Sequence, residues 1–389
     1  MAGKWHVPYA VLFLTNSCNL CCSYCFAGKT GLESMSLKTG RKTIDWLYKN
    51  TEGFHEDPLI VSFFGGEPLL RFSLLRQLVE YSKLQEDRYG KRMIFSVTTN
   101  GTLLNTAMLD FFEEHNISVL FSIDGDKATN DRFRMYKDGS SPFETIYNNA
   151  LRLLERFPNI AARMTVTKET IPVLASNIRF LNEELGFRFI SPCTALEQID
   201  DHESWRVFDR QCRAAAVYVT EKAMVNDYVH LHFLDNGIEQ ITSNHEVDVA
   251  CGAGKTFVGV DVEGSIYPCH RFVSYTGSDR TKFRLGSVYD GIDPAKTLPF
   301  RRYDRHHILG CYTRCEECPA KNFCAGGCIA LHQEINGLFT MPLLQQQKLM
   351  NIWHNICIET IEWFKQAGRY DFLMEQITMK PKSFMPLND

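Results

Sequence analysis

Four cysteines lie within eight positions near the start of the chain, in the stretch TNSCNLCCSYCFAGK at residues 15–29. Thiolates bind iron–sulfur clusters, and one short loop can hold such a cluster because its irons lie close together. Three thiolates would leave one iron without a protein ligand, and a metal with an open position can bind a small molecule. A closed zinc site is the weaker alternative, because no histidine stands near these cysteines.

The spacing alone leaves two sets of three ligands open. Cys18, Cys22 and Cys25 form the pattern C-x3-C-x2-C. Cys18, Cys21 and Cys25 would fit into one loop as well. The residue spacing therefore predicts a cluster with three thiolate ligands and does not say which of the two middle cysteines takes part.

A second array of cysteines stands in the C-terminal part of the chain. It contains seven cysteines in order, namely Cys251, Cys269, Cys315, Cys318, Cys324, Cys328 and Cys357. Disulfide scaffolds are usually short secreted chains, whereas this chain has 389 residues and no export signal. The spacings C-x2-C-x5-C-x3-C therefore favour metal ligation in a reducing cytoplasm.

Composition excludes several other classes of protein. The net charge is −4 and there are no basic runs, so nothing indicates nucleic-acid binding. The longest apolar run near the N-terminus, VPYAVLFL, is too short to cross a bilayer. We therefore expect a protein of the cytoplasm with neither a nucleic acid nor a membrane as partner.

Short β-type runs alternate with helical patterns up to about residue 230. Buried strands are predicted at residues 10–15, 59–65, 93–99, 117–124, 161–167 and 187–192, and amphipathic helices at 36–50 and 73–87. This alternation predicts an α/β fold whose parallel sheet curls into a partial barrel of six strand–helix units. The motifs TNSCNLCCSYC, GGEP, TNG and SIDG each follow one of the first four strands, where such barrels carry their sites.

After residue 230 the pattern changes, and we expect helices to become sparse. DVEGSIYPC at 261–269 predicts a hairpin with Gly264 in its turn, and residues 343–366 predict a long helix that carries Cys357. We expect the chain to be divided into two domains, at residues 1–230 and 231–375, followed by a loosely held tail at residues 376–389.

The first cysteine loop resembles the signature loop of radical S-adenosylmethionine (SAM) enzymes, which have an aromatic residue just before the third cysteine. This resemblance selects Cys18, Cys22 and Cys25 and leaves Cys21 as a spare, packed thiol. It implies a 4Fe–4S cluster whose open iron binds SAM, and an external one-electron reductant. It also implies a set of cofactor-binding residues, which are Tyr24, Gly65, Gly66, Glu67, Thr99, Asn100, Ser122, Asp124, Arg134, Met164 and Thr165.

The C-terminal array resembles the SPASM extension of radical SAM enzymes, which binds two auxiliary 4Fe–4S clusters. The resemblance implies that Cys315, Cys318, Cys324 and Cys357 hold one auxiliary cluster and that Cys251, Cys269 and Cys328 hold the other. An eighth ligand is missing, and the nearest upstream cysteine is Cys212. We therefore expect one open iron, with Cys311 as the residue that could close it.

The resemblance implies that the substrate is a peptide or a protein. Maturases that form thioether or carbon–carbon cross-links in ribosomal peptides are favoured over anaerobic sulfatase-maturating enzymes. The latter carry Asp where this chain has His270, and Gln where it has Phe64. His270 is the tentative catalytic base. An iron–sulfur electron-transfer protein is the alternative from another class.

The expected partner is a precursor peptide. The first predicted strand starts near residue 9, which leaves no room before it for a domain that recognises the leader of such a peptide. A separate recognition protein is therefore expected to deliver the substrate.

Overall fold

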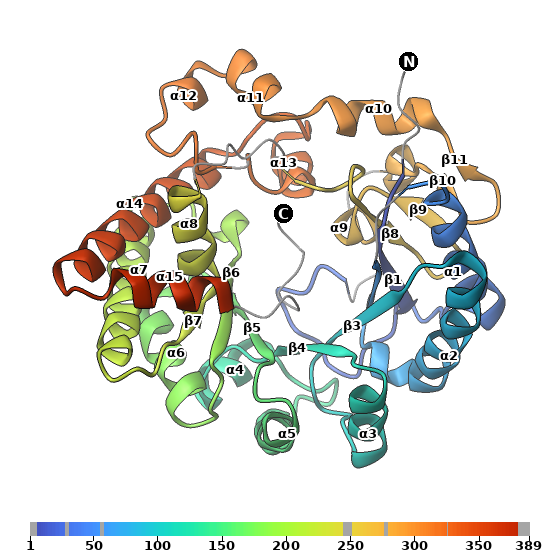
Figure 1. The fold of residues 1–389 in the computed structure, drawn as a ribbon, viewed down its shortest axis with the longest axis horizontal. Coiled ribbons are helices and arrows are strands. Elements are labelled where there is room, and N and C mark those ends of the chain that lie inside the picture. Colours follow the sequence, from blue (N-terminus) through green and yellow to red (C-terminus); the bar gives the residue numbers. More distant parts are fainter. Residues whose placement is uncertain are drawn as a thin grey trace. The chain divides into compact units, whose positions relative to one another are not determined.

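The structure is a computed structural model that describes residues 6–27, 31–54, 58–243, 251–275, 279–324 and 326–379 (Figure 1). The chain forms two compact units. Unit 1 contains Met1–Leu120, Phe133–Asn149 and Gly252–Tyr303. Unit 2 contains Phe121–Arg132, Ala150–Cys251 and Asp304–Asp389. Three of the five boundaries between the units fall inside strand β4 (Ser118–Ser122), helix α4 (Lys127–Phe133) and helix α5 (Phe143–Arg156).

The sheet of unit 1 has the strand order β11-β10-β9-β8-β1-β2-β3. Its parallel strands are β1 (Tyr9–Thr15), β2 (Leu59–Gly65), β3 (Met93–Thr99) and β8 (Phe257–Val260). Its antiparallel strands are β9 (Ser265–Tyr267), β10 (Gly286–Ser287) and β11 (Gly291–Ile292). Every residue of β1 is buried, as expected for a central parallel strand that is covered on both faces.

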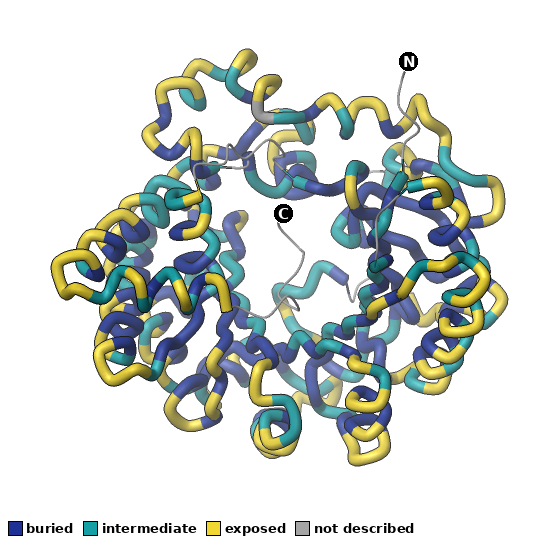
Figure 2. Tube along the Cα trace, viewed as in Figure 1, coloured by how far each residue is buried: buried dark blue, intermediate teal, exposed yellow. Residues whose placement is uncertain are grey.

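Helices cover this sheet because their apolar faces need a partner (Figure 2). Ser36 begins α1 (Leu37–Asn50) by accepting a hydrogen bond from the backbone N–H of Thr39. Gly40 lets α1 approach Leu78 of α2 (Phe72–Tyr89), since a Cβ at this position would lie 2.7 Å from that side chain. The other helical segments are η1 (Pro68–Arg71), α3 (Thr106–Glu114), α9 (His270–Val273), η4 (Arg280–Phe283) and α10 (Pro294–Arg302).

Unit 2 contains the parallel strands β5 (Ala161–Val166), β6 (Phe189–Thr194) and β7 (His230–Leu231). Its longer helices are α6 (Leu174–Glu183), α7 (His202–Met224), α8 (His232–Thr242), α14 (Leu344–Gln366) and α15 (Tyr370–Met379). Its shorter helical segments are η2 (Ile171–Val173), η3 (Leu196–Gln198), α11 (Arg305–Cys311), α12 (Thr313–Glu316) and α13 (Ile329–Asn336). Helix α14 packs against α7 and α8.

The six predicted strands, the two predicted helices and the long C-terminal helix are confirmed. The hairpin is confirmed too, with Gly264 at φ 89° in its turn. The expectation of few helices after residue 230 is wrong, because α8 to α15 all lie there. Several of these helices have fewer than ten residues and stand between cysteines, so they offer too short a window for helical periodicity.

Residues 376–379 end α15, where Ile377 is 1% exposed, and the rest of the predicted tail lies outside the described residues. The predicted domain boundary at residue 230 was placed where the sequence motifs change. The two compact units of the structure are divided at other residues, so this domain boundary stays a prediction.

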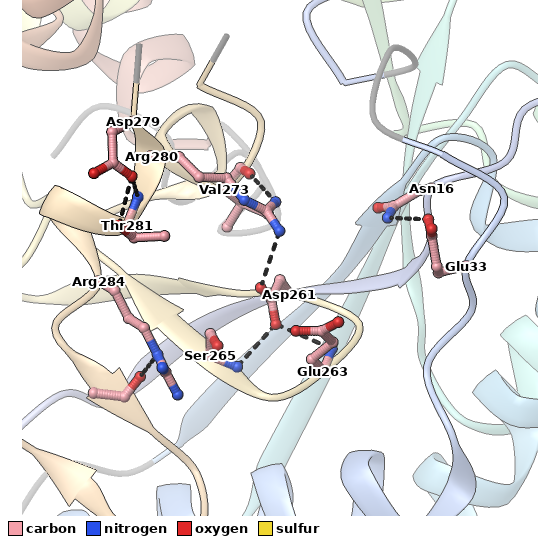
Figure 3. Close-up of polar contacts among 11 residues, drawn as sticks. Asn16, Glu33, Asp261, Glu263, Ser265, Val273, Asp279, Arg280, Thr281 and Arg284 are labelled. Atoms are coloured by element: carbon pink, nitrogen blue, oxygen red, sulfur yellow. Dashed lines mark hydrogen bonds and ion pairs between the residues drawn. The ribbon is translucent and has the colours of Figure 1, made fainter. Parts of the chain in front are cut away.

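A buried carboxylate fixes the turn between β8 and β9 (Figure 3). Asp261 Oδ1 accepts the backbone N–H groups of Glu263 at 3.0 Å and Ser265 at 2.8 Å. Arg280 lies 3.9 Å from Asp261 Oδ2 and donates to the carbonyl oxygen of Val273 at 3.0 Å. Arg280 thus ties the end of α9, the helix that follows Cys269, to this turn.

We predict that Asp261→Ala lowers the free energy of unfolding by about 2 kcal/mol, because two backbone N–H donors, one of them buried, lose their acceptor. Asp261→Asn keeps an acceptor oxygen and should lose less than half as much. Denaturant unfolding of the two variants measures the difference, and equal losses would contradict this account of the turn.

Candidate functional site

Three of the sequence motifs meet at one edge of the sheet of unit 1. Strands β1, β2 and β3 are parallel neighbours, so the loops that follow them leave the sheet at the same edge. These loops carry the first cysteines, GGEP and TNG. The predicted convergence of these three motifs is therefore confirmed within unit 1.

The two glycines of GGEP allow close contact with the cysteine loop. The backbone N–H of Gly66 donates to the carbonyl oxygen of Thr15 at 2.8 Å, and that of Glu67 donates to Ser17 at 2.8 Å. A Cβ at Gly65 would lie 2.2 Å from the oxygen of Thr15, and one at Gly66 would lie 2.1 Å from that of Ser17. Any larger residue at these two positions would push the loops apart.

Glu67 is fully buried and organises the ends of β2 and β3. Its Oε1 accepts the backbone N–H of Leu69 at 3.1 Å and the hydroxyl of Thr99 at 2.8 Å. Its Oε2 accepts the backbone N–H of Asn100 at 2.8 Å. Burial raises the pKa of Glu67 to about 7, against the opposing effect of these donors and of Arg134.

This pKa predicts how the stability of the cofactor-free protein depends on pH. The carboxyl group ionises near 4.5 in the unfolded chain and near 7 in the folded one. Folding therefore favours the protonated form, and the free energy of unfolding should fall as pH rises from 4.5 to 7, by about 3 kcal/mol. Denaturant unfolding of the wild type and of Glu67→Gln between pH 5 and 7.5 measures this, and parallel curves would contradict the prediction.

Cys18 is joined to the TNG loop. Its Sγ accepts the backbone N–H of Leu20 at 3.4 Å and the side-chain amide of Asn100 at 3.7 Å. Asn100 also donates to Asn19 Oδ1 at 3.0 Å. Burial raises the pKa of the Cys18 thiol to about 11, and the charge of Cys25 acts in the same direction. Binding of iron to Cys18 would therefore release a proton.

The expectation that Cys21 is packed is wrong, because Cys21 is exposed. Its thiol lies 3.5 Å from the carbonyl oxygen of Met135 and 3.4 Å from that of Tyr136. Its backbone N–H also donates to Met135 at 2.9 Å. Cys22 and Cys25 are half-buried, and the N–H of Cys25 donates to the oxygen of Cys22 at 3.1 Å.

Two more of the predicted cofactor residues lie together in unit 1. The guanidinium carbon of Arg134 lies 5.5 Å from the centre of the Tyr24 ring. Arg134 is buried, and its charge acts on the Glu67 carboxyl. Both side chains therefore belong to the surroundings of the first cysteine loop.

The remaining predicted cofactor residues lie in unit 2. Asp124 is 1% exposed, and its Oδ1 accepts the backbone N–H of Thr165 at 2.8 Å. The N–H of Ile123 donates to Arg163 at 3.0 Å, so the SIDG motif runs beside β5. Ser122 and Met164 are buried.

A small hollow in unit 2 is lined by part of the second cysteine array. Cys315, Cys318 and Cys324 line it, together with Arg314 and Lys321. The N–H of Gly326 donates to Cys324 Sγ at 3.3 Å. Burial raises the pKa of Cys324 to about 12. Three thiols beside two cations suit an anionic iron–sulfur cluster.

The other predicted ligands of this array are not among the residues that line the hollow. Cys357 is buried against α8, where a Cβ on Gly237 would lie 2.5 Å from its Sγ. Cys251 and Cys328 are half-buried in unit 2, and Cys269 precedes α9 in unit 1. Cys212 is buried in α7.

No three Cys, His, Asp or Glu side chains of the described residues converge on a single metal position. Each iron of a cubane binds its own thiolate, so the ligands of a cluster need not converge on one point.

Phe64 and His270, which the sequence singles out separately, belong to one aromatic group at this edge of unit 1, and the sequence did not predict that contact. Phe26, Phe64 and His270 contact one another, with ring centres 5.3–6.1 Å apart. The guanidinium carbon of Arg271 lies 5.4 Å from the centre of the Phe26 ring. All four side chains are half-buried. Because β8 pairs with β1, helix α9 and its His270 lie at the same edge of the sheet as the first cysteine loop. The order of the motifs along the chain does not indicate this pairing.

Residues 12–175 match the family model of the Radical SAM superfamily. This part of the chain is therefore a radical SAM domain. The family implies SAM and one 4Fe–4S cluster as cofactors. Cys18, Cys22, Cys25 and the GGEP motif lie inside the matched segment.

The chain is also similar to two relatives. It is 33% identical to the uncharacterized protein MJ0907 of Methanocaldococcus jannaschii over 45% of this chain and 58% of that protein, so it spans little more than half of that relative. It is 23% identical to the cysteine-type anaerobic sulfatase-maturating enzyme of Clostridium perfringens strain 13, over 81% of this chain and 86% of that enzyme.

Two solved structures share the fold. Native anSMEcpe with bound AdoMet and Cp18Cys peptide superposes with a TM-score of 0.72 at 19% identity, covering 95% of this chain and 99% of that one. SuiB of Streptococcus suis bound to the precursor peptide SuiA gives 0.57 at 17% identity, covering 84% and 72%. The expected fold class, an α/β fold with a parallel sheet of the radical SAM type followed by a cysteine-rich region, is thereby confirmed.

None of the helices in the described ranges is both long and apolar enough to cross a membrane.

Proposed function

We propose that this protein is a radical SAM peptide maturase that abstracts hydrogen from a peptide substrate and forms a thioether or carbon–carbon cross-link. The proposal rests on the hydrogen bonds that join the loops after β1, β2 and β3 at one edge of the sheet of unit 1. There, the backbone of GGEP is hydrogen-bonded to the cysteine loop, and Glu67 is bonded to the TNG loop. This arrangement holds three thiols and a buried carboxyl group in one fixed neighbourhood.

The residues of this edge would divide the binding of SAM among them. Cys18, Cys22 and Cys25 would hold the cluster, and Glu67 would take the methionine ammonium group. Arg134 would pair with the methionine carboxylate, and Tyr24, Thr99 and Asn100 would contact the rest of the cofactor. The resemblance also implies that Ser122, Asp124, Met164 and Thr165 bind the cofactor, and this stays a prediction. Bound there, SAM and its cluster would supply a 5′-deoxyadenosyl radical that takes a hydrogen atom from the substrate.

The preference for a peptide substrate rests on relatives and on two residues. Both solved structures that share the fold were determined with a bound peptide. The resemblance implies that Phe64 and His270 stand where sulfatase-maturating enzymes carry Gln and Asp, and in this structure their ring centres are 5.3 Å apart. These two departures therefore form one local difference, which favours cross-linking over formylglycine formation.

A sulfatase-maturating enzyme remains the second proposed function, because such an enzyme aligns over most of this chain. An electron-transfer protein is the proposal from another class. An electron carrier needs no open iron and therefore binds no SAM. The buried Glu67 beside the cysteine loop would then have no cofactor to bind.

Anaerobic incubation with SAM and dithionite tests the proposal. Reconstituted protein should form 5′-deoxyadenosine, whereas intact SAM would favour the electron carrier. Precursor peptides with cysteine, and a sulfatase peptide, then separate the two enzymes by mass spectrometry. A loss of two hydrogens from the precursor supports cross-linking, and conversion of cysteine to formylglycine supports the alternative.

We predict that His270→Asn lowers peptide modification by about 100-fold if His270 is the base. Formation of 5′-deoxyadenosine should continue, because the cysteine loop is unchanged. The ratio of modified peptide to 5′-deoxyadenosine measures this uncoupling. Unchanged coupling would assign His270 a purely structural role beside Phe26 and Phe64.

The wider setting is proposed on the same basis. Residues 1–230 would be the radical SAM core, and residues 231–375 would be a SPASM domain with two auxiliary 4Fe–4S clusters bound as the resemblance implies. One auxiliary iron would be either open or closed by Cys311. A separate recognition protein and an external one-electron reductant would act in the cytoplasm.

A further inference from the structure

Asn351 on α14 contacts one of the cysteines that line the hollow of unit 2. Its side-chain Oδ1 lies 3.3 Å from Cys318 Sγ, and the Cys318 thiol donates to it. Cys318 is buried and lines the hollow, whereas Asn351 is half-buried and is not among the lining residues. Both residues belong to unit 2. The amide of Asn351 therefore reaches a predicted ligand sulfur from outside the space that a cluster would fill.

Further contacts fix α14 against the loop that carries these cysteines. The ring centres of Phe323 and His354 are 5.5 Å apart. A Cβ on Gly237 would lie 2.5 Å from Cys357 Sγ and 2.7 Å from Phe323 Cε2, so both side chains pack against the same glycine. One helix therefore supplies a predicted ligand, Cys357, and the amide of Asn351.

The direction of this hydrogen bond must reverse when Cys318 binds iron. A cysteine binds a metal as the thiolate, which has no proton and can only accept. A half-turn of the Asn351 amide replaces its oxygen by its NH₂ group, which can donate to the thiolate. Within the part of the chain that the structure describes, the NH₂ group of Asn351 makes no hydrogen bond, so the turn breaks none.

The other two thiols of the hollow already have donors. Cys324 Sγ accepts the backbone N–H of Gly326 at 3.3 Å. Burial raises the pKa of Cys315, and a hydrogen bond from Arg314 opposes that rise. With the amide of Asn351 turned, each of the three sulfurs would accept one hydrogen bond. Such bonds to the sulfurs are among the factors that set the reduction potential of an iron–sulfur cluster.

We propose that Asn351 is a positioning residue that donates its amide N–H to the Cys318 thiolate and thereby raises the reduction potential of the auxiliary cluster at this hollow. This inference rests on the proposed auxiliary clusters. Reduction adds negative charge to the cluster and its sulfurs, so a hydrogen bond to the thiolate becomes stronger in the reduced state. Asn351 therefore makes it easier for this cluster to take up an electron.

Redox titration followed by electron paramagnetic resonance tests this role. The full-length variant Cys18→Ala/Cys22→Ala/Cys25→Ala removes the SAM-binding cluster, so only auxiliary clusters contribute to the spectrum. In this background, Asn351→Leu removes the donor and should make reduction of one cluster about fivefold less favourable, which is ~40 mV for one electron. The other cluster should keep its potential. Asn351→Asp should lower the potential further, because a carboxylate cannot donate and adds a negative charge.

Two further variants separate this role from a structural one. Asn351→Gln keeps an NH₂ group and should restore most of the potential. Asn355→Leu is the matched control, because Asn355 is exposed on the same helix, and it should leave both potentials unchanged.

Unchanged potentials in Asn351→Leu and Asn351→Asp at full iron content would overturn the inference. Loss of iron from all three Asn351 variants would overturn it as well, because Asn351 would then be needed only for the structure of the site. Absence of iron from the background variant would overturn it together with the auxiliary clusters. Formation of 5′-deoxyadenosine by the wild type tests the first cluster, and with it the proposed function, separately.

Discussion

Replacing Cys22 with serine should abolish the formation of 5′-deoxyadenosine, a loss of about 1,000-fold or more that corresponds to ~4 kcal/mol. The proposed cluster would lose one of its three protein ligands, and a serine hydroxyl is a poor substitute for a thiolate. Cys21→Ser should retain activity to within about twofold. The Cys21 thiol lies beside two backbone carbonyl oxygens, and a serine hydroxyl can donate to the same oxygens.

The two variants are matched controls, because they make the same chemical change at adjacent positions. Iron content and 5′-deoxyadenosine formation should fall together in Cys22→Ser. Loss of both in Cys21→Ser, with Cys22→Ser active, would reverse the ligand assignment that the resemblance implies.

Glu67→Ala should cause the largest loss of stability, about 3–5 kcal/mol in the free energy of unfolding. It would leave two buried N–H groups and the Thr99 hydroxyl without their acceptor. Glu67→Gln should lose less, because an amide keeps one acceptor oxygen. Glu80→Ala is the matched control, since Glu80 is exposed and forms only a 3.5 Å surface ion pair with Arg76.

Denaturant unfolding at one pH compares these three variants. A loss for Glu67→Ala no greater than that for Glu80→Ala would show that Glu67 does not hold the two strand ends together. In that case, calorimetric measurement of SAM binding to reconstituted Glu67→Gln would show whether the carboxyl group of Glu67 contributes to cofactor binding only.

The strands and helices in the first half of the chain could be predicted from the sequence, because each has its own pattern of apolar residues. Continuous apolar runs mark the buried parallel strands, and the first is buried along its whole length. Short helices between the C-terminal cysteines carry no such signal, so the expectation of few helices failed there. The prediction that Cys21 is packed failed because its surroundings are formed by Met135 and Tyr136, which are far away in the sequence.

The sequence by itself determined which chemistry this protein could perform, since the spacing of the cysteines and the order of the motifs after the strands are local properties of the chain. Only the tertiary structure decided which groups meet. Strand β1 lies between β2 and β8, so the loop after the first strand contacts both GGEP and the segment that follows Cys269. The order of strands in a sheet depends on long-range pairing, and neighbouring residues do not encode that pairing locally. For the same reason the burial of the Glu67 carboxyl group became visible only in the folded protein.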